Sequence, residues 1–241
     1  LEDYLKLLKA SREESETLSR ELLIQVTDFF RDPDVFEGIT QLVLPQIFSS
    51  PENTPIRIWV PGCATGEEVY SLAITLLEFL GSRAINQDFQ LFGTDLSDSA
   101  IETARAGLFP ETISRHVSEE RLQRFFVKKS DGYRIATSIR NMCIFARQNV
   151  VDDPPFSRVD LISCRNLLIY LDAPLQKKVM GLFNYSLKPG GFLVLGPSES
   201  IGTSSELFAP VDKRLRIFTK KILPGKIHST LFAPVDRSTQ M

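Results

Sequence analysis

The sequence predicts an α/β fold: a doubly wound, mostly parallel sheet with a small N-terminal helical region and an inserted β-hairpin subdomain. Two observations carry this prediction. From residue 56 onward, short apolar runs alternate with helical patterns, and a glycine-punctuated turn follows the first of these runs. Such alternation is typical of a parallel sheet that helices cover on both faces. With 241 residues and 43% hydrophobic content, the chain is long enough to bury one good core.

Residues 1–50 form the expected N-terminal helical region. A charged stretch with leucines at helical spacing runs to about Phe30. Arg31-Asp-Pro33 ends it, because a residue before proline avoids the α conformation. A second helix is expected from Asp34 to about Phe48, followed by a linker to residue 55.

The expected main domain covers residues 56–221, and residues 222–241 are an expected irregular tail. Strands are predicted at 56–60, 89–93, 142–147, 159–163, 192–196 and 214–220, and helices at 67–80, 97–106, 118–126 and 174–187. The inserted β subdomain is expected over about 126–146, with its turn at Ser130-Asp-Gly132. The string Leu-Phe-Ala-Pro-Val-Asp occurs at 207–212 and again at 231–236, which is too few copies for a repeat architecture.

Composition narrows the function classes. The net charge of −2 gives no global field that would attract nucleic acid or an anionic membrane. No apolar run approaches a membrane span, and the N-terminus lacks a signal-peptide core, so no membrane insertion is expected. Three distant cysteines favour a reducing cytoplasm, and two histidines without a Cys-x-x-Cys pair predict no metal site. A start at Leu1 rather than Met predicts a domain taken from a longer chain.

The segment from Ile56 to Tyr70 predicts a ligand site. A buried strand leads into a turn with glycines at 62 and 66, and the following helix begins with Glu67 and Glu68. This order places backbone N–H groups and a helix N-terminus at the carboxyl end of a strand, where nucleotide-like ligands bind. The spacing matches neither the dinucleotide fingerprint nor the P-loop. Two carboxylates would repel a pyrophosphate and favour an ammonium or sulfonium, so a cationic nucleoside is the predicted ligand.

Polar residues follow the next strands. Asp95 ends the second strand, where an acidic side chain can bind the two hydroxyls of a ribose. The alternative role is a helix cap, which Ser97 can fill instead. Asn149 follows the third strand, and its amide can bind an adenine edge, although asparagine is common in loops.

The fourth strand runs directly into Arg165, Asn166 and Tyr170. Polar groups at this end of a strand belong to a site more often than to the scaffold.

Five segments together resemble the chemotaxis receptor glutamate methyltransferases, the CheR family: Val26-Thr-Asp-Phe-Phe-Arg31, Gly62 to Glu68, Thr94-Asp95, Cys164-Arg-Asn166 with Ile169-Tyr170, and Pro189-Gly-Gly191. The likeness extends to about Lys220. The sequences at 152–156 and 167–171 resemble those of one subset of the family, the CheB/CheR fusions. These long proteins join methylesterase, methyltransferase and sensor modules in one chain.

The resemblance implies a class I methyltransferase fold that uses S-adenosyl-L-methionine and releases S-adenosyl-L-homocysteine. It implies methyl transfer to glutamate carboxylates on helices of chemotaxis-type receptors, in the cytoplasm. Carried over by position, the cofactor-binding residues are Gln25, Thr27, Arg31, Gly62, Ala64, Glu67, Glu68, Asp95, Asn149, Val150, Arg165 and Asn166. Thr27 and Arg31 would hold the methionine end and Glu68 its ammonium, with Glu67 as a second candidate. Asp95 would bind the ribose, and Asn149, Arg165 and Asn166 would surround the adenosine. Arg31 and Tyr170 stand nearest the methyl transfer, whereas Gln25 and Val150 replace the Asn and Leu usual in the family.

Alternatives remain open at this point. The chain can be a cofactor-binding sensor that has lost catalysis, or a methyltransferase for another carboxylate or for nucleic acid, although the charge opposes nucleic acid.

A basic cluster before and within the hairpin is either an ordinary solvated face or a docking surface for acidic receptor helices; it comprises Arg115, Arg121, Arg124, Lys128 and Lys129. The short loop at 127–132 predicts that no receptor pentapeptide tether is used.

Overall fold

The structure is a computed structural model that describes residues 27–49, 55–86 and 88–221. The helix expected before residue 27, the candidate Gln25, the expected tail and the second hexapeptide copy lie outside these ranges. No helix in the described part of the chain is both long and apolar enough to cross a bilayer.

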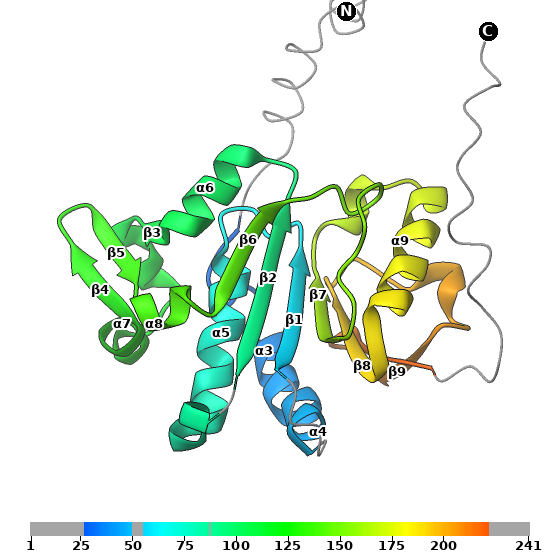
Figure 1. Cartoon of the computed structure of the whole chain (residues 1–241), viewed down its shortest axis with the longest axis horizontal. Coiled ribbons are helices and arrows are strands. Elements are labelled where there is room, and N and C mark those ends of the chain that lie inside the picture. The colour runs from blue at the N-terminus through cyan, green and yellow to red at the C-terminus, as the bar shows by residue number, and fades with distance from the viewer. Residues whose placement is uncertain (1–26, 50–54, 87, 222–241) are drawn as a thin grey trace, which may run out of the picture.

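A seven-stranded sheet forms the centre of the molecule (Figure 1). Its order is β6-β2-β1-β7-β8-β10-β9; the first five strands are parallel to one another, β10 runs antiparallel to β8, and β9 runs antiparallel to β10. The strands are β1 Ile56–Pro61, β2 Phe89–Asp95, β6 Cys143–Arg147, β7 Val159–Cys164, β8 Leu187–Leu195, β9 Phe208–Asp212 and β10 Ile217–Lys220. The predicted mostly parallel sheet is confirmed.

The end of the sheet differs from the prediction of one strand over 214–220. Residues 213–216 form a turn, Arg216 has a positive φ of 56°, and β10 begins only at Ile217. The preceding β9 was missed by the sequence analysis, and it covers residues 208–212, the last five of the first hexapeptide copy. Pro210 lies within β9, where proline removes a backbone donor. The position is tolerated because β9 is the last strand of the sheet.

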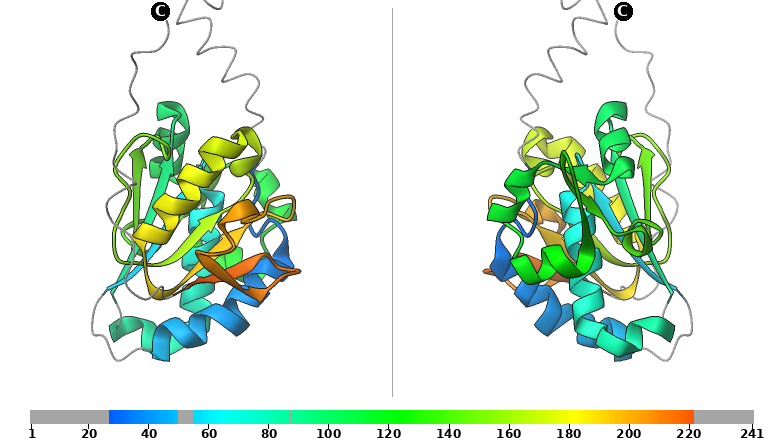
Figure 2. Two further views of the ribbon diagram at one scale, coloured as in Figure 1. Left: turned by 90° about the vertical axis from the view of Figure 1, so that its right-hand side faces the viewer. Right: turned by 90° about the vertical axis from the view of Figure 1, so that its left-hand side faces the viewer.

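Helices cover both faces of the sheet, with α9 on one side and α3, α4 and α5 on the other (Figure 2). The helices are α3 Pro33–Gly38, α4 Leu44–Ser49, α5 Glu67–Leu80, α6 Asp98–Ala106, α7 Glu119–Phe125, α8 Thr137–Arg140 and α9 Ala173–Ser186. Shorter helical turns are η2 Gly81–Asn86, η3 Glu111–Arg115, η4 Leu168–Tyr170 and η5 Gly202–Ser204. Ser97 caps α6 by accepting a hydrogen bond from the Ala100 amide, as the sequence allowed.

The helix expected over 34–48 is present but contains a π-helical segment, η1 Ile39–Val43, between α3 and α4. Pro45 follows this segment and lacks the N–H that an α-helix needs at that position. A wider turn before a proline is one way in which a helix continues past it.

Alternating side chains of β1 fill the two halves of the core. Ile58 and Val60 pack on the α5 side, whereas Trp59 packs on the α9 side. Trp59 is fully buried, lies edge-on to Phe183 with ring centroids 5.6 Å apart, and donates its indole N–H to the Thr94 hydroxyl at 3.0 Å. The prediction that Trp59 serves packing is confirmed.

The inserted subdomain is a three-stranded sheet of order β3-β5-β4, seen at the left of Figure 1. Its strands are β3 Leu108–Phe109, β4 Phe126–Lys129 and β5 Gly132–Ile135. The hairpin is shorter than the expected 126–146, because α8 follows β5 and Cys143–Arg147 pairs with β2 in the main sheet. Gly132 is required at the turn, since a Cβ there would lie 2.0 Å from the Phe109 carbonyl oxygen.

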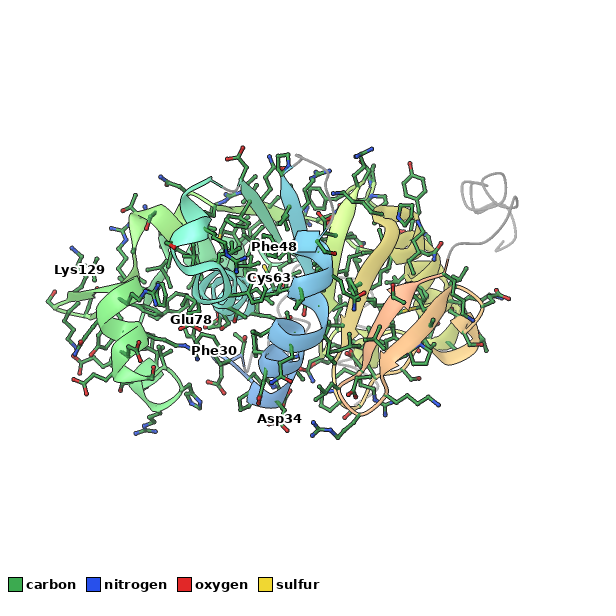
Figure 3. All side chains as sticks on the ribbon, turned by 90° about the horizontal axis from the view of Figure 1, so that it is seen from below. Phe30, Asp34, Phe48, Cys63, Glu78 and Lys129 are labelled. Carbon is green, nitrogen blue, oxygen red and sulfur yellow. The ribbon has the colours of Figure 1, made fainter. Side chains whose placement is uncertain are left out.

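Arg121 ties the subdomain to the main domain. Its guanidinium donates two hydrogen bonds of 2.8 Å to Glu78 of α5 and lies 3.9 Å from the centroid of the Phe30 ring. Phe30 and Glu78 lie close together in Figure 3. Phe29 and Phe30 are buried, so the prediction that they anchor the core is confirmed. Lys128 is likewise engaged by Glu111, so two members of the basic cluster have structural partners.

We expect Arg121→Ala to lower the free energy of unfolding by about 1–2 kcal/mol, because it removes a bidentate ion pair and a cation–π contact that are partly shielded from water. Urea denaturation would measure the change. Arg124→Ala is the matched control on the same helix, since Arg124 is exposed and its guanidinium lies over the ring of its neighbour Phe125, 4.8 Å from the centroid. Equal destabilisation by both variants would contradict this role of Arg121.

Candidate functional site

The glycine turn lies where the sheet order reverses, at the carboxyl end of β1 and beside β7. Gly62, Ala64 and Gly66 have positive φ angles of 70°, 46° and 94°. At Gly62 a Cβ would approach the side chain of Leu167 to 3.0 Å, so the turn packs directly on the loop after β7. The Cys63 amide donates to the Thr94 carbonyl at 3.0 Å, which fixes the turn against the end of β2.

Asp95 closes this turn. One carboxylate oxygen accepts a hydrogen bond from the Ala64 amide at 2.9 Å, and the other accepts one from the Ser97 amide at 2.9 Å. A carboxylate has about four acceptor positions, so each oxygen retains capacity for a ligand hydroxyl. The ribose contact stays a prediction, and the structure adds that Asp95 also shapes the backbone that would cradle the ligand.

Glu67 is a buried carboxylate at the start of α5, with only 8% of its surface exposed. The Thr65 hydroxyl lies 2.8 and 2.7 Å from its two oxygens. Burial raises the pKa of Glu67 to about 7, with a further small contribution from Asp28, although the Thr65 hydrogen bond opposes the shift. Within the described ranges no lysine or arginine forms an ion pair with Glu67. A ligand cation would therefore stabilise its ionised form.

Glu68 has a different environment. It accepts a hydrogen bond of 2.6 Å from the Ser163 hydroxyl, and it forms an ion pair of 3.3 Å with Arg165. Burial raises the pKa of Glu68, while Arg165 and Ser163 act in the opposite direction. The Glu68 carboxylate thus has a cationic partner in the protein, whereas the printed polar contact of the Glu67 side chain within the described ranges is the neutral Thr65 hydroxyl.

Arg165 connects the site to the N-terminal segment. Its side chain is 1% exposed, and besides Glu68 it donates to the Arg31 carbonyl at 2.7 Å and to the Asp32 carboxylate at 2.5 Å. The family resemblance implies a place for this guanidinium near the adenosine. The structure brings it to Glu68 and the Arg31 backbone, a position from which it joins the start of α5 to the segment before α3, and the adenosine contact stays a prediction.

The loop after β7 presents the remaining candidates. Asn166 adopts a positive φ of 60°, and η4 follows it. The amides of Asn166 and Leu168 both donate to Glu199, at 3.0 and 2.7 Å. Tyr170 is 53% exposed at the end of η4. Glu199 was not among the predicted site residues, although its Gly-Pro-Ser-Glu turn at the end of the fifth predicted strand was visible in the sequence.

The amide of Asn149 is occupied by its own turn. Its Nδ2 donates to Asp152 at 3.0 Å, and its Oδ1 accepts from the Val151 amide at 3.0 Å. Val150 is half-buried and packs against the α9 side of the core. The contact of Asn149 with an adenine edge stays a prediction, which would use the second Nδ2 proton or require the turn to rearrange.

Cys63 and Cys164 are free and buried. Burial raises the pKa of both thiols well above the ordinary value, and nearby carboxylates add to the shift. The thiolate is the reactive form of cysteine. The prediction that these two residues are buried fillers is therefore confirmed.

The sequence profile of one family, described as "CheR methyltransferase, SAM binding domain", matches residues 25–217. The chain belongs to the CheR methyltransferase family. The CheR chain is 39% identical over 226 residues to an uncharacterized 104.1 kDa protein of Rhodobacter capsulatus. It is 36% identical over 182 residues to chemotaxis protein methyltransferase 1 of Pseudomonas aeruginosa, and 32% identical over 223 residues to a chemotaxis protein methyltransferase of Vibrio parahaemolyticus.

The alignments cover 93%, 73% and 88% of this CheR chain, respectively. They cover 24% of the Rhodobacter protein, 66% of the Pseudomonas protein and 78% of the Vibrio protein. The chain therefore corresponds to about a quarter of a long relative and to most of the shorter ones.

S-adenosyl-L-methionine is the cofactor of this CheR domain, and the site fits it. The turn from Gly62 to Gly66 offers backbone at close approach, and Asp95 and Glu67 line it with negative charge. The bound cofactor supplies an electrophilic methyl group on a sulfonium. The residues that would hold it are those of the turn together with Asp95, Glu67 and the loop around Asn166.

With Glu67 as the predicted partner of the cofactor ammonium, cofactor affinity is expected to depend on pH. A carboxylate must be ionised to bind an ammonium, and the pKa of Glu67 in the free protein is about 7. Affinity should therefore be nearly complete above about pH 8, be about halved at pH 7 and fall further below it, with S-adenosylhomocysteine binding about tenfold weaker at pH 6 than at pH 8. Calorimetric titration at both values would measure this.

Two variants make the pH test specific. Glu67→Gln should bind weakly at both pH values, without the tenfold difference, because the titrating group is gone. Glu111→Gln removes an exposed carboxylate elsewhere and should keep the dependence. An undiminished pH dependence in Glu67→Gln would contradict the assignment.

Proposed function

We propose that this chain transfers the methyl group of S-adenosylmethionine to glutamate side chains on helices of chemotaxis-type receptors, giving glutamyl methyl esters and S-adenosylhomocysteine. The observation that carries the proposal is the exposed Tyr170, which a fixed loop holds at the carboxyl edge of the sheet in a CheR domain. Relatives that are named chemotaxis protein methyltransferases support the receptor as substrate.

The chemistry requires few protein groups. A glutamate side chain has an ordinary pKa of about 4.3 and is already ionised at neutral pH. Its oxygen attacks the methyl carbon while the carbon–sulfur bond breaks, so no proton is transferred. This suits a site whose candidate residues include no histidine.

The protein must therefore orient and desolvate the reactants. Opposite charges disappear as the ester forms, so water stabilises the reactants more than the transition state, and a site that excludes water accelerates the step. Positioning can contribute roughly 7–11 kcal/mol in favourable systems. Arg31, whose carbonyl is fixed by Arg165, would organise the methionine end of the cofactor, and the Tyr170 hydroxyl would donate one hydrogen bond to orient the incoming carboxylate.

For the cofactor ammonium we propose Glu67 as the principal partner. Its carboxylate is buried and has no ion-pair partner among the described residues, whereas that of Glu68 is engaged by Ser163 and Arg165. Glu68 would then act indirectly, by fixing Arg165 and through it the backbone of Arg31.

The proposed receptor-docking surface includes fewer basic residues than the five identified in the sequence. Arg121 and Lys128 have structural partners, so a docking surface for acidic helices would rest on Arg115, Arg124 and Lys129, which are exposed. The β4–β5 hairpin has four residues in each strand and a two-residue turn, which supports the absence of a pentapeptide tether.

Labelled methyl transfer to receptor-enriched membranes tests the proposal. We expect label that is released as methanol by mild base, because carboxyl methyl esters hydrolyse readily. Intact S-adenosylhomocysteine binding without any label would indicate the cofactor-binding sensor instead. Base-stable label would indicate another acceptor and contradict the proposal.

Tyr170→Phe tests the role of the rim tyrosine. We expect kcat to fall about 10–100-fold with unchanged S-adenosylhomocysteine affinity, because only the hydrogen bond that orients the acceptor is lost. Tyr185→Phe is the matched control, since Tyr185 is also partly exposed but lies near the start of β8, at the opposite edge of the sheet. An unaltered kcat in Tyr170→Phe would remove Tyr170 from the mechanism.

A further inference from the structure

We infer that Glu199 is a positioning residue for the methyl-transfer site: its buried carboxylate fixes the loop that carries Asn166 and Tyr170. The inference deepens the proposed function and rests on it for the catalytic readout alone. Glu199 follows β8, so it reaches the loop from a neighbouring strand about thirty residues further along the chain.

The Glu199 carboxylate accepts hydrogen bonds from three backbone amides. Its Oε2 accepts from Gly196 at 2.7 Å and from Asn166 at 3.0 Å, and its Oε1 accepts from Leu168 at 2.7 Å. Glu199 is only 4% exposed. Hydrogen bonds from N–H groups to a buried carboxylate are short and stronger than those between neutral groups. The three bonds therefore join the end of β8 to both sides of the positive-φ residue in the loop.

Gly196 makes this contact possible. A Cβ at that position would lie 2.7 Å from Oε2 of Glu199 and 3.0 Å from the Asn166 amide nitrogen. A Cβ at residue 196 would therefore force the Glu199 carboxylate away and press on the loop backbone. The Gly-Pro-Ser-Glu turn thus brings the carboxylate and the loop backbone into direct contact with no space left between them.

The loop is also held from its other side. Gln176 of α9 donates to the carbonyls of Leu168 and Leu171, each at 3.0 Å, and the Leu168 side chain is buried in the core. Between these anchors Ile169 and Tyr170 project outward, with 52% and 53% of their surfaces exposed. The backbone beneath Tyr170 is thereby fixed while its side chain stays exposed to solvent, where an acceptor can reach it.

The role requires a carboxylate. Each oxygen of Glu199 only accepts, and the three groups that face it only donate. In Glu199→Gln one oxygen becomes an NH2 group, which cannot accept. If the remaining oxygen serves Gly196 and Asn166, the NH2 faces the Leu168 amide, donor against donor. We therefore expect the Leu168 amide to be the group that loses its partner.

Amide hydrogen exchange, resolved by residue, provides a readout that does not depend on catalysis. In Glu199→Gln we expect exchange at Leu168 to accelerate by about tenfold or more, with a smaller change at Asn166. Asp160→Asn is the matched control at the other end of β7, where Asp160 accepts from the Arg57 amide at 2.8 Å and pairs with Lys188 at 2.8 Å. It should leave exchange at Leu168 unchanged.

Kinetics separate positioning from general stability. We expect Glu199→Gln to lower kcat for receptor methylation about tenfold, while Asp160→Asn leaves kcat within about twofold. In a Tyr170→Phe background, Glu199→Gln should lower kcat by less than about threefold, because both changes act on the same group.

The outcomes are distinguishable. Unchanged exchange at Leu168, or fully multiplicative effects of the two substitutions on kcat, would overturn the role of Glu199. If the wild-type chain transfers no methyl group to receptors, the proposed function fails. The exchange experiment then still decides whether Glu199 fixes the loop.

Discussion

The buried guanidinium of Arg165 is the interaction on which the site depends. It contacts a carboxylate on α5, a carboxylate in the N-terminal segment and the Arg31 carbonyl, three groups on two segments far from it in sequence. Removing one partner of a buried ion pair costs about 3–5 kcal/mol, because the other charge is left uncompensated. The short segment before α3 is thus bound to the sheet by charge as well as by the buried rings of Phe29 and Phe30.

Much of the fold followed from local signals. The change from an apolar run to glycines and then to Glu67 located β1, the turn and the first residue of α5, because each signal has one simple structural meaning. The edge strand β9 was missed, since Pro210 argues against a strand unless its outer side is known to be unpaired. The π-helical segment before Pro45 was equally hidden, because helical spacing does not separate it from an α-helix.

The site was predictable as a location but less so in its contacts. The parallel order placed Asp95, Arg165 and Asn166 at one edge of the sheet. Which carboxylate is available could not be predicted, because Glu67 and Glu68 differ only in the neighbours that folding gives them. The role of Glu199 could not be predicted for another reason. It accepts hydrogen bonds from backbone amides, which almost every residue type provides, so the sequence does not show which residues are its partners.

Trp59 is the one tryptophan of the sequence, and it lies directly below this edge. Its indole donates to Thr94, the residue before Asp95, and it is packed between aromatic rings with no exposure to water. The tryptophan fluorescence of the protein therefore comes from a single apolar position and should be emitted at short wavelength. A ligand that moves the end of β2 would alter that emission. Trp59 therefore serves as an intrinsic optical reporter, because its hydrogen-bond partner Thr94 is the sequence neighbour of the predicted ribose contact, Asp95.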